Sequence, residues 1–481
     1  MRSFALLTAL FWLATSAAQA APPASAYGQL PNVSDVAISP DGKHLAVLRA
    51  IGDQSAVEVV NTADLSSVGF IGRSEHVTIR GVSFGSNDRV LVDHTVTYNP
   101  QFGMEGGKGA NMFEYARTLA ADLDGKNSFV LLDKQGQQAG LTNLTSSWPA
   151  LPSDPDTVLM ETYEGKSVTS NDYVLTMKRV NMKTGADKLV ERGGPDTVSF
   201  IVNGAGEIVG RVDRNEITNN SILLSRPKGG GWKEISRYDS GVGGEGMVDI
   251  TMSDGRFIKF GKAKEGDDHD SMIAIDPNTG AQTTLFTPPG SFDIGGPIAD
   301  PYTGTAVGVS YLEDLPVQKY FDPALEAVRA KIAAKFGAQG YAALAGWDRA
   351  RTMFIVHGEY GAASPAYFLY NASTDKLSLI SKDYAGLGDA DVGDRVSLKY
   401  KARDGVSIPA YLNTPHGVPA RNLPLVVLVH GGPAARDDFT FDWWSAFVAS
   451  RGYAVLQPEY RGSAGYGTKW EDAGHKQWGK L

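Results

Sequence analysis

The sequence predicts a mainly β protein in which a seven-bladed β-propeller precedes the first part of an α/β domain. One observation is a turn, flanked by short apolar runs, that recurs about every 45–50 residues, a period typical of propeller blades. The other is a change near residue 395 to a strand–helix–strand order, with which α/β domains begin. The 55 glycines suit a chain with many tight turns.

The clearest copy of the repeat runs from Val36 to Leu48. Val36 and Ile38 alternate before an Asp41-Gly42 turn, and the alternation resumes after it, as in a β-hairpin. The weaker copies are centred on Ser86 to Asp88, Ser153 to Asp156, Asn203-Gly204, Ser253 to Gly255, Asp300-Pro301 and Trp347 to Arg349. Seven copies predict seven blades over residues 30–390. A string of β-sandwich domains is the alternative, but it would not explain the regular spacing.

Two segments interrupt the repeats. Residues 101–111 are rich in glycine and predict a surface excursion. Residues 322–344 predict a helical segment between the last two repeats, with Gly337 as its C-cap. Its apolar residues at helical spacing are Ala324, Leu325, Val328, Ile332 and Phe336.

Residues 1–20 have the pattern of a cleavable export signal. Arg2 precedes an apolar run from Phe4 to Ala18, and Ala18-Gln19-Ala20 fits the rule for cleavage before Ala21. A membrane anchor is the alternative, although a run of about fifteen apolar residues is short for a span. The sequence therefore predicts an exported protein, periplasmic or extracellular, without a membrane span after cleavage.

Composition excludes several kinds of partner and chemistry. The net charge of −9 argues against nucleic acid as a partner, because no basic field would attract phosphates. The absence of cysteine excludes disulfides, thiol catalysis and thiolate metal sites. The histidines are scattered without the spacing of metal ligands. We therefore expect neither a metal nor an organic cofactor.

Residues 395–481 predict a new domain rather than an eighth blade. Residues 396–400 and 408–412 predict two strands around a turn at Asp404-Gly405. Residues 425–429 are apolar at every position, as in a parallel strand covered on both faces. A helix over 442–451, closed by Gly452, and a strand over 453–456 complete the pattern.

His430-Gly431-Gly432-Pro433 directly follows the predicted strand over 425–429. Acyl transfer develops negative charge on a carbonyl oxygen, which backbone N–H groups of small residues can approach without obstruction. An oxyanion donor lies in the loop after the third strand of α/β-hydrolases. Taken alone, the motif fits an oxyanion hole and a structural turn equally well.

Residues 425–479 resemble the start of the peptidase domain of the prolyl oligopeptidase family, particularly the acylaminoacyl-peptidase and dipeptidyl-peptidase branch. The matching stretches are His430 to Pro433, Arg436-Asp437, Ala449 to Pro458, Tyr460 to Gly467, Gly474 and Trp478-Gly479. The resemblance implies an incomplete α/β-hydrolase domain. It implies Gly432 as an oxyanion donor and Gly431 as support for its turn. It further implies that His430, Pro433, Tyr460 and Arg461 shape the site without a catalytic role.

The family's nucleophile lies in a Gly-x-Ser-x-Gly elbow, followed by the acid and the base. The resemblance places all three beyond Leu481, so this chain is expected to lack the triad and to be inactive alone. Residues 81–85 satisfy Gly-x-Ser-x-Gly, but Ser83 falls in a predicted blade strand that leads to another strand. A nucleophile elbow joins a strand to a helix, so Ser83 is not the expected nucleophile.

For the complete protein, the sequence predicts an exported serine peptidase that hydrolyses short peptides by acyl-enzyme chemistry. The propeller would limit entry to the site. A non-catalytic propeller binding protein with a vestigial hydrolase tail and an esterase on the same scaffold remain alternatives. The strand over 425–429 would lie at an open sheet edge, which favours aggregation. We therefore expect residues 30–390 to be more soluble than all 481, and equal solubility and melting of the two would contradict this.

Overall fold

The computed structural model describes residues 21–52, 54–72, 77–98, 113–133, 148–165, 173–215, 217–227, 230–239, 246–361, 363–432, 434–477 and 479–480. The predicted export signal, the excursion over 101–111 and Pro433 lie outside the described residues.

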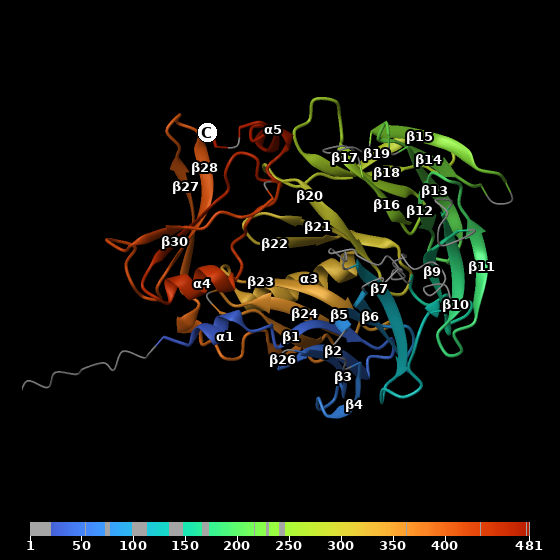
Figure 1. Cartoon of the computed structure of the whole chain (residues 1–481), viewed down its shortest axis with the longest axis horizontal. Coiled ribbons are helices and arrows are strands. Elements are labelled where there is room, and N and C mark those ends of the chain that lie inside the picture. Colours follow the sequence, from blue (N-terminus) through green and yellow to red (C-terminus); the bar gives the residue numbers. More distant parts are fainter. Residues whose placement is uncertain are drawn as a thin grey trace, which may run out of the picture.

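Seven blades of antiparallel strands form a propeller in the described part of the chain (Figure 1). One parallel pair, between Val202 and Ile250, joins blades 4 and 5 into a single eight-stranded sheet. Blades 1 and 2 contain β1 (Val33–Ile38), β2 (His44–Ile51), β3 (Gln54–Asn61), β4 (Ser67–Ile71), β5 (Val77–Phe84), β6 (Arg89–Tyr98), β7 (Phe113–Asp122) and β8 (Phe129–Val130). Blades 3 and 4 contain β9 (Thr157–Glu164), β10 (Val174–Asn181), β11 (Asp187–Arg192), β12 (Thr197–Val202), β13 (Ile208–Asn215), β14 (Asn220–Ser225) and β15 (Lys233–Asp239). Blades 5 to 7 contain β16 (Gly246–Thr251), β17 (Phe257–Lys262), β18 (Asp270–Ile275), β19 (Gln282–Phe286), β20 (Ile294–Ala299), β21 (Ala306–Leu312), β22 (Pro316–Tyr320), β23 (Tyr341–Trp347), β24 (Met353–Glu359), β25 (Ala366–Asn371) and β26 (Lys376–Lys382).

In six of the seven blades of the described structure, the recurring turn joins the first two strands, as between β1 and β2 or between β23 and β24. In blade 3 it precedes β9, and the Trp148 N–H donates to the Leu159 carbonyl on that strand. Apolar packing closes the ring, because Val36 and Leu45 of blade 1 share a buried cluster with Ile355 and Leu369 of blade 7. The predicted propeller is therefore confirmed.

The helix between blades 6 and 7 ends at the predicted C-cap, Gly337, and so covers only the first part of the predicted helical segment. α3 (Pro323–Phe336) begins at Asp322, whose carboxylate accepts from the Ala324 and Leu325 N–H groups. It ends at Gly337, where a φ of 76° favours glycine. The predicted helical segment over 322–344 was wrong beyond Gly337. Residues 341–347 instead form β23, which pairs with β24 at the start of blade 7.

The second domain is a four-stranded sheet in the order β27-β28-β30-β29, drawn in orange and red beside the ring (Figure 1). Its elements are η1 (Asp389–Asp391), β27 (Asp394–Lys401), β28 (Ser407–Thr414), β29 (Leu425–Val427), α4 (Trp443–Ala449), β30 (Ala454–Pro458) and α5 (Thr468–Asp472). β29 and β30 are parallel. This is the strand–helix–strand unit that the sequence predicted.

β29 lies at one edge of this sheet. Leu425 and Val427 are more than half exposed within the described structure. The predicted open edge is therefore confirmed, but the prediction of a strand covered on both faces was wrong for the described residues. The apolar pattern indicates that the strand can be buried. Whether the strand is buried depends on which elements pack on it.

α1 (Ala24–Gly28) joins the start of the described chain to the second domain, since it packs on α4 (Figure 1). Tyr27 is 1% exposed and lies among Tyr384, Leu387 and Ala446. Its ring makes an edge contact with Phe447, and its hydroxyl donates to the Asp391 carbonyl at 2.8 Å. The N-terminal segment thus helps to hold the two domains together.

Replacing Tyr27 by Phe is expected to lower the free energy of unfolding by about 1 kcal/mol. The substitution keeps the ring but leaves the Asp391 carbonyl without the hydrogen bond from the Tyr27 hydroxyl. Thermal unfolding of both proteins measures the difference. Tyr384→Phe removes another hydroxyl from the same cluster and serves as the control, since the structure gives the Tyr384 hydroxyl no hydrogen bond to a described residue. An equal loss in both variants would contradict this role for Tyr27.

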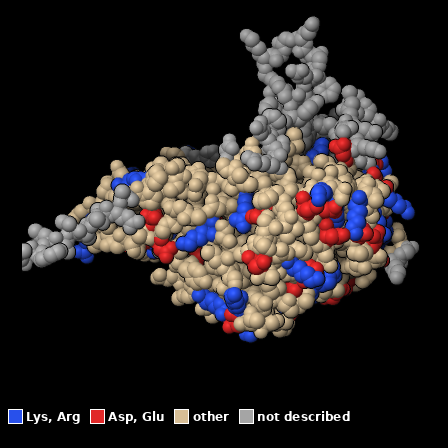
Figure 2. All heavy atoms as spheres, turned by 90° about the horizontal axis from the view of Figure 1, so that it is seen from below, with Lys and Arg blue, Asp and Glu red and all other residues tan. Residues whose placement is uncertain are grey.

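Within the described residues, no helix is long and apolar enough to cross a membrane. On the face drawn in Figure 2, acidic and basic side chains lie next to one another over the described surface. That face therefore has mixed charge, and it offers no broad basic field to a polyanion.

Candidate oxyanion loop

The loop after β29 brings His430, Gly431 and Gly432 to the end of the strand. Gly432 has a φ of 122°, which L side chains rarely adopt. A Cβ atom there would lie 2.8 Å from the Ala434 nitrogen. Gly431 and Gly432 are both exposed, and neither N–H group donates to a residue that the structure describes. The loop therefore presents two backbone N–H groups that are not used in folding contacts with the described chain.

These glycines line a cavity of about 520 Å³. His430, Tyr460 and Arg461 also line it. Arg461 pairs with Asp404 in the turn between β27 and β28. This ion pair fixes the cavity wall, which agrees with a shaping role for Arg461.

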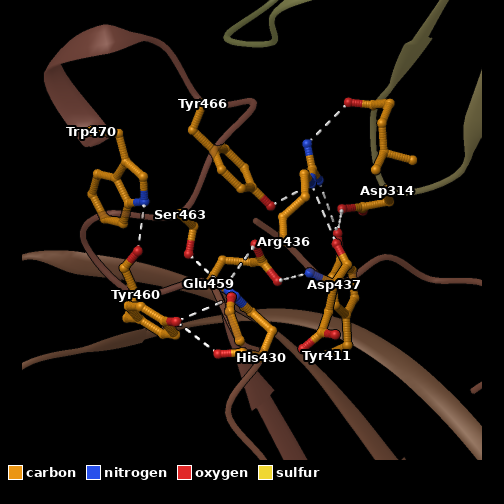
Figure 3. Close-up of polar contacts among 12 residues, drawn as sticks. Asp314, Tyr411, His430, Arg436, Asp437, Glu459, Tyr460, Ser463, Tyr466 and Trp470 are labelled. Carbon is orange, nitrogen blue, oxygen red and sulfur yellow. Dashed lines mark hydrogen bonds and ion pairs between the residues drawn. The ribbon is translucent and has the colours of Figure 1, made fainter. Parts of the chain in front are cut away.

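His430 is held from three sides (Figure 3). Its ring stacks on Tyr460, with centroids 4.4 Å apart, and the Tyr460 hydroxyl donates to the His430 carbonyl at 2.8 Å. Its Nδ1 lies 2.8 Å from the Gly431 carbonyl, and its Nε2 lies 2.8 Å from the Ser463 Oγ. The carbonyls of His430 and Gly431 are thus fixed by side chains, and this orients the peptide that carries the Gly432 N–H.

Ser463, His430 and Glu459 resemble a catalytic triad in composition but not in geometry. In a triad, the serine and the acid bind opposite nitrogens of the histidine. Here the Ser463 Oγ and the Glu459 Oε2 both face Nε2, at 2.8 and 3.9 Å. Ser463 is also 0% exposed, so no substrate carbonyl can reach it. These residues support the loop and do not form an acyl-transfer triad.

Ser83 is likewise unsuited to catalysis. It lies near the end of β5, which turns directly into β6 instead of entering a helix. This matches the prediction that the Gly-x-Ser-x-Gly match at residues 81–85 is part of a blade.

The loop that continues from Gly432 reaches the propeller (Figure 3). The Arg436 guanidinium donates to the carbonyls of Leu312 and Glu313, at 3.1 and 2.8 Å, in the turn after β21. It also donates to the Tyr466 hydroxyl and lies over that ring. Blade 6 therefore contacts the segment that carries the oxyanion donors, and the propeller borders the candidate site.

Sequence analysis gave no role to Glu459 or Ser463. Ser463 belongs to the stretch that resembles the family, but nothing in the sequence indicates that its side chain contacts His430. Glu459 is a carboxylate just after a predicted strand, where an exposed side chain is the ordinary expectation. It is 0% exposed in the structure. Only the packing of β30 against the loop reveals both contacts.

Comparisons with known proteins agree with this architecture. The family model described as "Prolyl oligopeptidase family" matches residues 439–481. Dipeptidyl aminopeptidase BIII of Pseudoxanthomonas mexicana is 27% identical over 98% of this chain and 68% of its own length. Dipeptidyl peptidase family member 6 of Caenorhabditis elegans is 31% identical over 25% of this chain and 20% of its own length.

Solved structures show the same fold at low sequence identity. A puromycin-hydrolyzing peptidase of Mycobacterium tuberculosis has a TM-score of 0.60 at 13% identity, covering 95% of this chain and 71% of its own. The acylaminoacyl peptidase of Pyrococcus horikoshii has a TM-score of 0.58 at 13% identity, covering 94% and 68%. The near full-length similarity to a dipeptidyl aminopeptidase and the family match over residues 439–481 agree: the chain is similar to serine peptidases of the prolyl oligopeptidase family.

Proposed function

We propose that the complete protein is an exported serine peptidase that hydrolyses short peptides, and that the loop after β29 is its oxyanion hole. The observation that carries this proposal is the exposed Gly431-Gly432 backbone at the cavity wall, whose N–H groups have no partner in the described structure. A backbone N–H group placed where a carbonyl oxygen becomes negative stabilises the transition state more than the ground state, and so it accelerates the reaction.

In the proposed reaction, a serine hydroxyl attacks the peptide carbonyl while a histidine takes its proton. The tetrahedral intermediate carries its charge on oxygen, next to the Gly432 N–H, and collapses to an acyl-enzyme as the amine leaves with that proton. Water then hydrolyses the ester. By resemblance to the family, we expect the serine, the acid and the histidine after residue 481. We therefore infer that the 481-residue chain alone does not turn over substrate.

The proposed substrates are short peptides, with removal of dipeptides as the first activity to test. The similarity to a dipeptidyl aminopeptidase over 98% of the chain favours this choice. The contact of Arg436 with blade 6 supports a role for the propeller in limiting access, because it sets the ring against the oxyanion loop. Export is proposed from the signal pattern of residues 1–20 alone.

Expression of the whole reading frame tests the proposal, with the 481-residue chain as the matched control. The complete protein should release the chromophore from chromogenic dipeptidyl amides, at a rate orders of magnitude above that of the control. A serine-directed phosphonate should abolish this activity. If the complete protein hydrolysed simple esters but not peptide amides, the result would favour the esterase alternative. A reading frame that stops after residue 481, with peptide binding but no turnover, would favour the non-catalytic alternative.

A further inference from the structure

Glu459 is buried directly behind the oxyanion loop (Figure 3). Its side chain is 0% exposed. One carboxyl oxygen, Oε1, accepts from the Asp437 N–H at 2.8 Å. The other, Oε2, makes no hydrogen bond with any residue that the structure describes, and it lies 3.9 Å from the His430 Nε2. The mechanism proposed above assigns no task to this carboxyl group.

The contacts of His430 limit where protons can lie. Nδ1 is 2.8 Å from the Gly431 carbonyl, which only accepts, so Nδ1 carries a hydrogen. The second nitrogen faces both the Ser463 hydroxyl and the free oxygen of Glu459. The separation of 3.9 Å is too long for a hydrogen bond, so Oε2 of Glu459 receives no proton from His430. A protonated Glu459 is electrically neutral, and removal of its proton leaves one buried negative charge.

The surroundings of Glu459 favour its protonated form. Burial raises the pKa of Glu459 from 4.5 to about 8, and the nearby Asp437 and Asp438 act in the same direction. The Asp437 N–H and the Arg436 guanidinium lower the pKa of Glu459, but by less than burial raises it. Arg436, however, forms no ion pair with Glu459 in the described structure and donates to blade 6 instead. Burial also raises the pKa of Tyr460, so the neighbouring phenol stays neutral over this pH range.

We propose that the buried Glu459 carboxyl group is protonated behind the oxyanion loop, and that loss of this proton sets the upper pH limit of the catalytic step. The proposal rests on the proposed function, because the charge matters through the Gly432 N–H. Deprotonation would place a negative charge behind the group that must stabilise a developing oxyanion. A unit charge within about 10 Å, at an effective dielectric constant of about 20, changes a rate about tenfold. Glu459 is thus a positioning and charge-setting residue, not a catalytic one.

Protonation of Glu459 is tested without catalysis by NMR of the 481-residue chain carrying ¹³C-labelled histidine, because the His430 ring lies beside the carboxyl group. His430→Gln assigns the His430 signal. In the wild type that signal should shift with a midpoint near pH 8, and Glu459→Gln should abolish the step because its amide does not titrate. Asp437→Asn changes the other partly buried carboxylate of the loop and should retain the step. The proposal is overturned if the wild-type signal shows no step between pH 7 and 9. It is also overturned if the step persists in Glu459→Gln or is lost in Asp437→Asn.

The effect on catalysis is tested with the complete enzyme. The wild-type kcat for a dipeptidyl amide should fall about tenfold above pH 8 with little change in KM, and Glu459→Gln should remove that alkaline limb. A limb that is unchanged in Glu459→Gln overturns the catalytic part of the proposal. If the complete protein has no peptidase activity, the proposed function fails, whereas the NMR titration still decides whether Glu459 is protonated.

Discussion

Replacing Arg395 by Met is expected to lower the free energy of unfolding by about 3–5 kcal/mol, the cost of leaving a buried charge without its partner. Arg395 in β27 donates to Glu359 at the end of β24, at 2.6 Å, and to the Gly361 carbonyl. The two side chains are 8% and 0% exposed. Glu359 also accepts from the Phe441 N–H at 2.9 Å. This ion pair therefore joins blade 7 to two segments of the second domain.

Lys399→Met provides a matched control, because it makes the same charge change at an exposed position of the same strand. Urea unfolding followed by circular dichroism should show a large loss for Arg395→Met and a change within about 0.5 kcal/mol for Lys399→Met. Burial already raises the pKa of Glu359, and losing Arg395 raises it further. Protonation below that pKa removes the unpaired charge, so the loss should shrink as the pH falls toward 5. Equal losses in both variants at neutral pH would contradict the role of the buried pair.

Gly432→Ala should lower the kcat of the complete enzyme by about 10²–10³-fold with little change in KM, the loss typical of an oxyanion donor. The backbone at Gly432 has a φ of 122°, and a Cβ would come within 2.8 Å of the Ala434 nitrogen and 3.0 Å of the Ala435 nitrogen. The loop must therefore move, and the Gly432 N–H moves with it.

Gly431→Ala is the matched control for Gly432→Ala. A Cβ at Gly431 would meet no atom within 4 Å, so the loop keeps its shape. The control should consequently lose much less activity than Gly432→Ala. Steady-state kinetics on a dipeptidyl amide measures both variants. Comparable losses in kcat would show that any methyl group in the cavity interferes, and would contradict a specific role for the Gly432 backbone.

Local chemistry made the propeller predictable. Six of the seven blades in the described structure begin with two strands around a turn whose residues are visible in the sequence, and Asp322 and Gly337 mark the ends of α3. The loop glycines were predictable for the same reason, because a strand followed by His430-Gly431-Gly432 is a local pattern. The helix prediction failed beyond Gly337, where β23 forms through pairing with β24.

Contacts between distant segments were not predictable. Arg436 meets the Leu312 carbonyl 124 positions away, and Tyr27 meets the Asp391 carbonyl 364 positions away. The burial of Glu459 depends on the loop that folds over the end of β30, and nothing next to it in sequence indicates this. Long-range packing therefore determines both the link between the domains and the electrostatics behind the oxyanion loop.

The most direct test of the oxyanion hole is a crystal structure of the complete protein inhibited by a dipeptidyl phosphonate. The phosphonyl oxygen that replaces the oxyanion should lie 2.7–3.1 Å from the Gly432 nitrogen, as donors of this kind require. A phosphonyl oxygen directed away from the loop, with the Gly432 nitrogen beyond about 4 Å, would contradict the assignment.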